Sequence, residues 1–127
     1  MKKAKVFLQD IPPYEQNLLV CSGVTKSKQV MDFVTNKEVK QWVKDNGQKF
    51  ADILNDKKQG YAINHDNFLI LIIKPYKNHW DWYETLLHEL NHIVFWITEA
   101  KSLQGEMEAQ AYLQEWLFRE IRRKLRT

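Results

Sequence analysis

Apolar residues occur at two different spacings along this chain, and each spacing predicts a different kind of element. The segment at 68–73 is uniformly apolar, which is typical of a buried central strand. The run at 60–64 is less apolar and more typical of an edge. The turn-rich residues between them predict a hairpin. Strands are predicted, from this spacing and from the flanking turn residues, at 6–8, 17–22, 60–64 and 68–73.

Helical spacing fills the remaining segments. Between 27 and 54, apolar residues recur every three or four positions, which predicts one or two helices with a break near 35–36 or 46–47. A further helix is predicted from about His79 to Ile97, and an amphipathic helix from about Glu106 to Leu125. Because the link between these last two helices is short, we expect them to pack antiparallel.

This order of elements predicts an α+β fold. In it, a short, mostly antiparallel sheet lies on one side of the last two helices. The chain has 127 residues, of which 44% are hydrophobic, which is enough for one core but not for two. We therefore expect a single domain that spans residues 1–127.

The strongest chemical signal is the pentapeptide His-Glu-Leu-Asn-His at 88–92, an H-E-x-x-H pattern within the helix predicted from His79. Histidines four positions apart project from one face of a helix and can reach the same metal ion. Glu89 lies beside that metal, where a general base is needed. The surrounding helix is almost entirely apolar, so these polar groups are costly unless one ion satisfies them together. The pattern favours a Zn²⁺ site over the alternative, two histidines hydrogen-bonded within the core.

A zinc site needs a third protein ligand. At about 1.5 Å per residue, His92 and Glu108 lie at the same level of two antiparallel helices, so Glu108 is the predicted ligand. Glu106 is the alternative, although it is equally typical of a solvated acid favoured by the helix dipole. Tyr112 is predicted on the same face as Glu108, to stabilise an oxyanion or to hydrogen-bond a ligand, with packing alone as its alternative role.

The two motifs together resemble a known family. H-E-x-x-H followed by Glu-Ala-Gln-Ala-Tyr at 108–112 is similar to the E-x-x-A-Y or E-A-x-x-F segment of small gluzincin-type zinc metallopeptidases, which include ImmA/IrrE-type proteins and short phage and mobile-element proteins. The resemblance implies a zincin-like fold in which Glu108 is the third ligand. The chain departs from the family at Asn91, where glycine is frequent. The interval from His92 to Glu108 is also short, which implies a minimal domain.

These residues predict hydrolysis of a peptide bond in a peptide or protein substrate. Zinc held by His88, His92 and Glu108 lowers the pKa of water towards about 7, and Glu89 takes the proton and passes it to the leaving amine. The resemblance implies that the substrate lies extended along the edge strand at 60–64. The alternative is a non-catalytic zinc-binding or interaction protein that docks a partner through its basic C-terminal helix.

The charge of the chain bears on whether it binds nucleic acid. The net charge is +3, and the basic excess is concentrated at the two ends of the chain. A basic helix end is usually a match to the helix dipole, so nucleic-acid binding is not expected.

The single cysteine, Cys21, excludes an intramolecular disulfide and is predicted to be a buried core residue in a reducing, cytoplasmic location. No apolar run approaches the roughly 20 residues of a membrane-spanning helix, and no secretory signal is expected.

Overall fold

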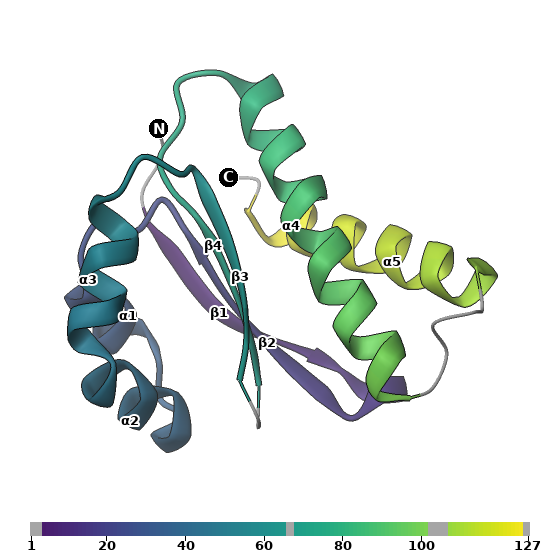
Figure 1. Ribbon diagram of the computed structural model, residues 1–127, viewed down its shortest axis with the longest axis horizontal. Coiled ribbons are helices and arrows are strands. Elements are labelled where there is room, and N and C mark those ends of the chain that lie inside the picture. Colours follow the sequence, from purple (N-terminus) through teal and green to yellow (C-terminus); the bar gives the residue numbers. More distant parts are fainter. Residues whose placement is uncertain (1–3, 66–67, 102–106, 126–127) are drawn as a thin grey trace.

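The computed structural model describes residues 4–65, 68–101 and 107–125 (Figure 1). Helices and strands follow one another in the predicted order. The 27–54 segment was predicted to hold one or two helices, but it is broken at both candidate positions and forms three. The elements, in chain order, are β1 (Lys5–Ile11), a short 3₁₀ helix (Pro12–Tyr14), β2 (Gln16–Ser22), α1 (Ser27–Phe33), α2 (Lys37–Asp45), α3 (Gly47–Asn55), β3 (Gly60–Asn64), β4 (Leu69–Ile73), α4 (His79–Ala100) and α5 (Met107–Leu125).

The strands in the described residues form one mixed sheet in the order β1-β2-β4-β3. β1 is antiparallel to β2, and β3 is antiparallel to β4, with Gly60 opposite Ile73 and Asn64 opposite Leu69. This confirms the predicted hairpin. β4 inserts beside β2 and runs parallel to it, so the sheet is mixed. The uniformly apolar β4 is central, and β3 pairs on one side only within the described chain, as predicted for an edge strand.

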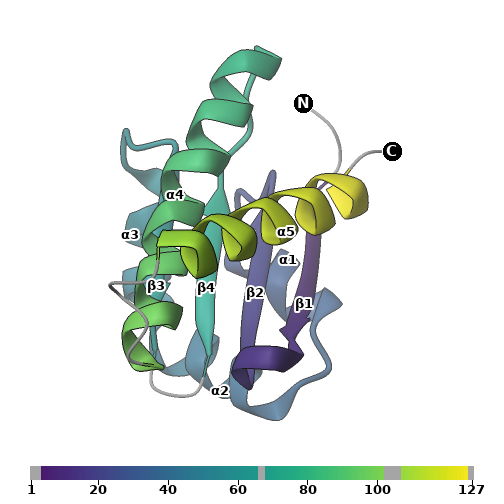
Figure 2. The same cartoon turned by 90° about the vertical axis from the view of Figure 1, so that its right-hand side faces the viewer.

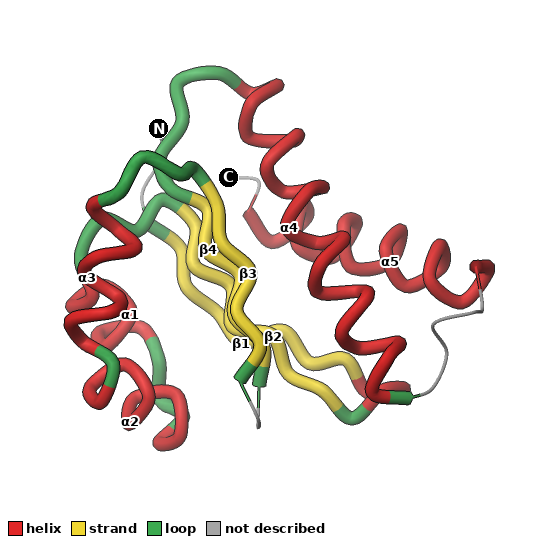
Figure 3. Tube along the Cα trace, in the orientation of Figure 1, coloured by secondary structure: helices red, strands yellow, loops and turns green. Residues whose placement is uncertain are grey.

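Helices cover both faces of this sheet, which makes the fold three layers thick (Figures 1 and 3). Alternate side chains of β2 point to opposite faces. Leu18 and Val20 join the apolar cluster under α4 and α5, whereas Leu19 and Cys21 join the cluster under α1, α2 and α3. Burial on both faces explains why β2 and β4 read as continuous apolar runs, and it gives the 27–54 helices their place.

The last two helices do not form the antiparallel pair that we expected. α5 crosses α4 obliquely and continues over β2 and β1 (Figures 1 and 2). Leu113, Leu117 and Ile121 of α5 are buried in the same cluster as residues of the sheet. The helix therefore follows the uncovered part of the sheet instead of the axis of α4, and oblique crossing is the commonest class of helix packing.

α4 has a buried face and an exposed one, although its sequence is apolar around most of its circumference. Leu86, Leu90 and Ile93 are fully buried, but Leu87 is 42% exposed. The apolar sequence of α4 therefore does not mean that the core encloses it on all sides. No helix within the described ranges combines the length and the apolar character needed to cross a membrane.

Burial determines the chemistry of Cys21. Its side chain is fully buried, as predicted, and burial raises the pKa of the thiol to about 12. At pH 8 only about one molecule in ten thousand carries the reactive thiolate. We expect iodoacetamide to alkylate the native protein at least about a hundredfold more slowly than the urea-unfolded protein, in which the pKa returns to about 8.5. Equal rates in the two states, measured by mass spectrometry, would contradict this burial.

Candidate metal centre

The helix that carries the H-E-x-x-H residues starts at a well-defined cap. Asn78 precedes α4 in an extended conformation, and its side-chain oxygen accepts a hydrogen bond of 2.8 Å from the backbone N–H of Trp80. Asp81 in the first turn is favoured by the helix dipole. From this start the helix continues to Ala100, so the pentapeptide lies in its middle, where the backbone is regular.

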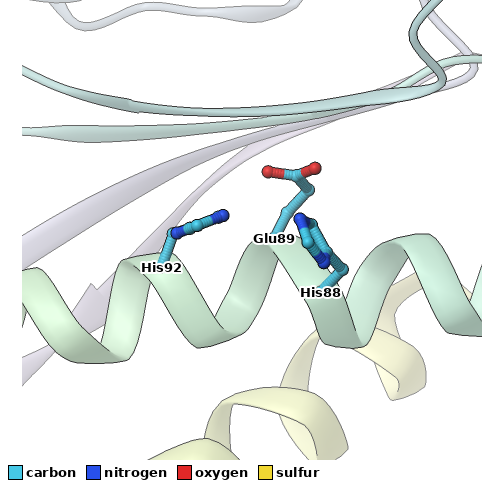
Figure 4. Close-up of side chains that lie close together, drawn as sticks. All are labelled: His88, Glu89 and His92. Atoms are coloured by element: carbon cyan, nitrogen blue, oxygen red, sulfur yellow. The ribbon is translucent and has the colours of Figure 1, made fainter.

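His88, Glu89 and His92 form one group, in which a ligand atom from each lies within 4.8 Å of those from the other two. The imidazole ring centroids are 5.0 Å apart. Figure 4 shows all three side chains projecting from α4 towards the strands. The prediction that the two histidines share a face of the helix is confirmed, and the group has the composition of a metal site.

The two histidines are exposed, and the side chain of one is held by an aromatic neighbour. The ring of His92 stacks on Trp96, with centroids 6.0 Å apart and an angle of 25° between the planes. Trp96 is half-buried against the core. Within the described chain, neither His88 nor His92 makes a hydrogen bond through its ring. The ring nitrogens are therefore available to a ligand from solvent.

Glu89 differs from its neighbours because it is only 8% exposed. Within the described ranges, its carboxylate has neither a hydrogen bond nor an ion pair. Its oxygens still reach solvent, since the buried side-chain nitrogen and oxygen atoms without a hydrogen bond in the described residues are Trp82 Nε1 and Arg122 Nε. A cation beside it, or a water molecule polarised by that cation, would supply the missing partner. This donor set can hold a metal ion.

Glu89 is buried because α4 approaches β3 closely at Gly60. A Cβ placed on Gly60 would lie 2.4 Å from Cγ2 of Thr85 and 3.1 Å from Cγ of Glu89. A larger side chain at this position would require Thr85 or the helix that carries it to shift. The hydroxyl of Thr85 is hydrogen-bonded to that of Tyr76, in the connection between β4 and α4, which fixes the methyl group of Thr85 against the glycine.

The start of β3 is held from the opposite face of the sheet. The buried Lys74 ammonium group donates a hydrogen bond of 2.9 Å to the Asp56 carboxylate, and the backbone N–H of Lys74 donates to the carbonyl of Gln59. The hydrogen bond from Lys74 is the main reason why the pKa of Asp56 is lowered. The Tyr61 hydroxyl donates to the same carboxylate. These contacts anchor the residues on either side of Gly60.

The structure does not bring Glu108 or Tyr112 to this group. Glu108 is exposed in the first turn of α5, and Tyr112 is 67% exposed on the same helix. α5 begins on the side of α4 that faces away from the sheet, whereas the histidines project towards it (Figures 1 and 4). The oblique crossing of the helices causes this separation. Glu106, the alternative ligand, lies outside the described residues.

Two residues that matter to the geometry were missed by the sequence analysis. Gly60 begins the strand predicted at 60–64 but was not identified as a contact point, and Thr85 was given no role. A glycine within a strand pattern is itself a signal of a close backbone approach. That signal identifies Gly60, although it does not identify Thr85 as the residue that packs on it.

Known proteins give no further guide to this site. No family model, no curated protein sequence and no solved structure matches the chain. The chemistry must therefore be argued from the cluster, its burial and its neighbours on α4 and β3.

The close approach at Gly60 predicts a specific pair of stability changes. Gly60→Ala should lower the free energy of unfolding by about 1–3 kcal/mol, because the new methyl group overlaps Thr85. Adding Thr85→Ser should restore most of the loss, since serine lacks Cγ2 but keeps the hydroxyl that bonds Tyr76. Urea unfolding of the single and double variants measures this coupling.

Gly47→Ala is the matched control. A Cβ on Gly47 meets nothing within 4 Å, and this glycine lies in α3, so alanine should leave stability unchanged or raise it by up to about 1 kcal/mol. A Gly60→Ala protein as stable as wild type would show that the helix and strand are not in contact. Failure of Thr85→Ser to compensate would assign the strain to another neighbour.

Proposed function

We propose that this protein is a zinc-dependent peptidase with a zincin-like fold, in which Glu89 is the general base. The observation that carries the proposal is the mostly buried Glu89 carboxylate without a protein partner, directly beside two exposed histidines on one face of α4. The H-E-x-x-H pattern is typical of this chemistry. A carboxylate that has no partner among the described residues and lies beside two exposed histidines favours a functional role over a structural one.

In this proposal, His88 and His92 hold the metal through their ring nitrogens. Glu108 is the third ligand on the resemblance alone, and Glu106 is its alternative. Ligation by Glu108 would require the first turn of α5 to move around α4. Because the described geometry does not supply this ligand, the metal-binding experiment below includes both glutamates.

Each residue of the group would have a distinct task. When bound, Zn²⁺ would supply Lewis-acid chemistry, lowering the pKa of water and polarising the scissile carbonyl. Glu89 would accept a proton from the attacking water and later donate it to the amine nitrogen as the C–N bond breaks. Its contact with Gly60 would hold the carboxylate in place for both transfers. Tyr112 remains a proposed oxyanion donor, subject to the same movement of α5 as Glu108.

The open edge of β3 supports a peptide substrate. Within the described chain, β3 pairs only with β4, so its other edge presents unpaired backbone groups beside α4. An extended peptide can add to such an edge through main-chain hydrogen bonds, whatever its sequence. Gly60 places this edge next to Glu89. We therefore propose that the substrate binds along β3 with its scissile bond near the histidines.

The alternative is a non-catalytic protein that contacts nucleic acid through the basic end of α5. The described contacts of that region favour a structural role for its charges. Lys124 donates a hydrogen bond to Gln9 of β1, while Arg119 and Arg123 form ion pairs of 2.8 Å with Glu115 and Glu120. The bond from Arg123 is the main reason why the pKa of Glu120 is lowered. A protein that binds zinc but cleaves no peptide would nevertheless favour this non-catalytic alternative.

Metal binding is the first test. One zinc ion should bind per chain, and His88→Ala or His92→Ala should each weaken binding by more than about a hundredfold, measured by calorimetric titration and elemental analysis. His79→Ala is the matched control, because His79 is an exposed histidine on the same helix outside the group. Undiminished zinc in both His88→Ala and His92→Ala would refute the site.

The same titration compares Glu108→Ala with Glu106→Ala. Loss of binding in the first variant alone would identify Glu108 as the third ligand despite its exposed position. Loss in the second alone would identify Glu106.

Glu89→Gln separates catalysis from metal binding. Glutamine has nearly the same shape, so zinc content and thermal stability should change little. The amide cannot accept a proton, and cleavage should slow by about 10²- to 10⁴-fold. Cleavage of unstructured polypeptides is followed by mass spectrometry. Equal zinc-dependent cleavage by wild type and Glu89→Gln would exclude Glu89 as the base.

A further inference from the structure

A surface cleft of about 580 Å³ opens beside the first half of α4. It lies between this helix, the connection from β4 to α4 and the residue that precedes β3. Its lining includes Gln59, Tyr76, Lys77, Asp81, Glu84 and Thr85. None of these residues belongs to the candidate metal centre, so the cleft is a separate feature of the surface.

The cleft and the metal centre both adjoin the contact at Gly60. Thr85 lines the cleft and packs on Gly60, and Glu89 packs on the same glycine from one turn further along α4. Gln59, at the other wall, directly precedes Gly60. Measured along the helix axis, Glu84 lies about 6 Å and Asp81 about 10 Å before His88. A ligand that follows the edge of β3 past the histidines would therefore reach the cleft.

The charged side chains of the cleft are predominantly acidic. Asp81 and Glu84 lie three residues apart, on adjacent turns of one helix face, and Lys77 is the only cation in the lining. Within the described part of the chain, neither carboxylate has a hydrogen bond or an ion pair. Both are exposed and accessible to a ligand. Such carboxylates recognise an ammonium or guanidinium group by charge-assisted hydrogen bonds.

We infer that this cleft binds a lysine or arginine side chain of the substrate, two or three residues from the bond that is cut. An extended chain advances about 3.3 Å per residue, so two or three residues span the 6–10 Å between the histidines and the two carboxylates. Asp81 and Glu84 are then specificity-determining residues, and Lys77 opposes the same interaction. The inference rests on the proposed peptidase function for its substrate, but the cleft can be tested without hydrolysis.

The test measures peptide binding to the Glu89→Gln protein, which keeps the fold but removes the proposed base. Three fluorescein-labelled octapeptides, identical except for lysine, norleucine or glutamate at one central position, are titrated and followed by fluorescence anisotropy. We expect the lysine peptide to bind about three- to tenfold more tightly than the norleucine peptide, and the glutamate peptide to bind most weakly. The preference should decrease as the salt concentration rises.

Three further variants in the Glu89→Gln background assign the preference to the cleft. Asp81→Asn with Glu84→Gln should abolish it, whereas Lys77→Gln should increase it. Glu38→Gln with Asp45→Asn is the matched control. It removes two exposed carboxylates from α2, which lies on the other face of the sheet. Glu38 lies in the first turn of its helix, as Asp81 does in α4. Circular dichroism confirms that each variant is folded.

Equal affinity for the three peptides would overturn the inference. A lysine preference that survives Asp81→Asn with Glu84→Gln, or that the α2 control abolishes equally, would also overturn it by assigning the effect to net charge. Failure of the proposed peptidase function can be distinguished from failure of the cleft. A protein that binds no zinc and cuts no peptide, but keeps a lysine preference dependent on Asp81 and Glu84, would refute the peptidase and retain the cleft.

Discussion

The close contact between α4 and β3 at Gly60 is the constraint on which the candidate site depends. It determines how deeply Glu89 is buried and where the open edge of β3 lies relative to the histidines. The contact is held from both sides, by Tyr76 through Thr85 and by Lys74 through the residues before Gly60. A glycine here therefore controls the separation of two elements that carry different parts of the site.

The burial of Glu89 and the exposure of its two neighbours follow from a rotation of about 100° per residue along a helix. All three side chains project towards the strands, but Glu89 lies against Gly60 whereas the two imidazoles remain exposed. Apolar residues on the same side of α4 stabilise this contact between the helix and the sheet. Leu86, Leu90 and Ile93, which are fully buried against the sheet, provide this stabilisation.

Local features of the fold were predictable from sequence because they depend on neighbours along the chain. The apolar run of β4 identified a central strand, the less apolar β3 an edge, and the spacing of His88 and His92 a shared helix face. The direction of α5 was not predictable in this way. It depends on how Leu113 and Leu117 fill the uncovered surface above β2 and β1, a long-range packing preference that no spacing within the helix records. The prediction that Glu108 lies level with His92 assumed that the two helices are antiparallel. It failed because α5 runs in another direction.

α4 packs on the sheet along one face and on α5 where the two helices cross, with buried side chains on successive turns. Local fraying, which exposes loops and chain ends in most proteins, does not reach the middle of such a helix. The positions of His88, Glu89 and His92 are thus linked to the global stability of the domain. A destabilising substitution far away, under α1 or at the end of α5, therefore raises the fraction of molecules without an intact site by about five- to thirtyfold for each 1–2 kcal/mol of stability lost.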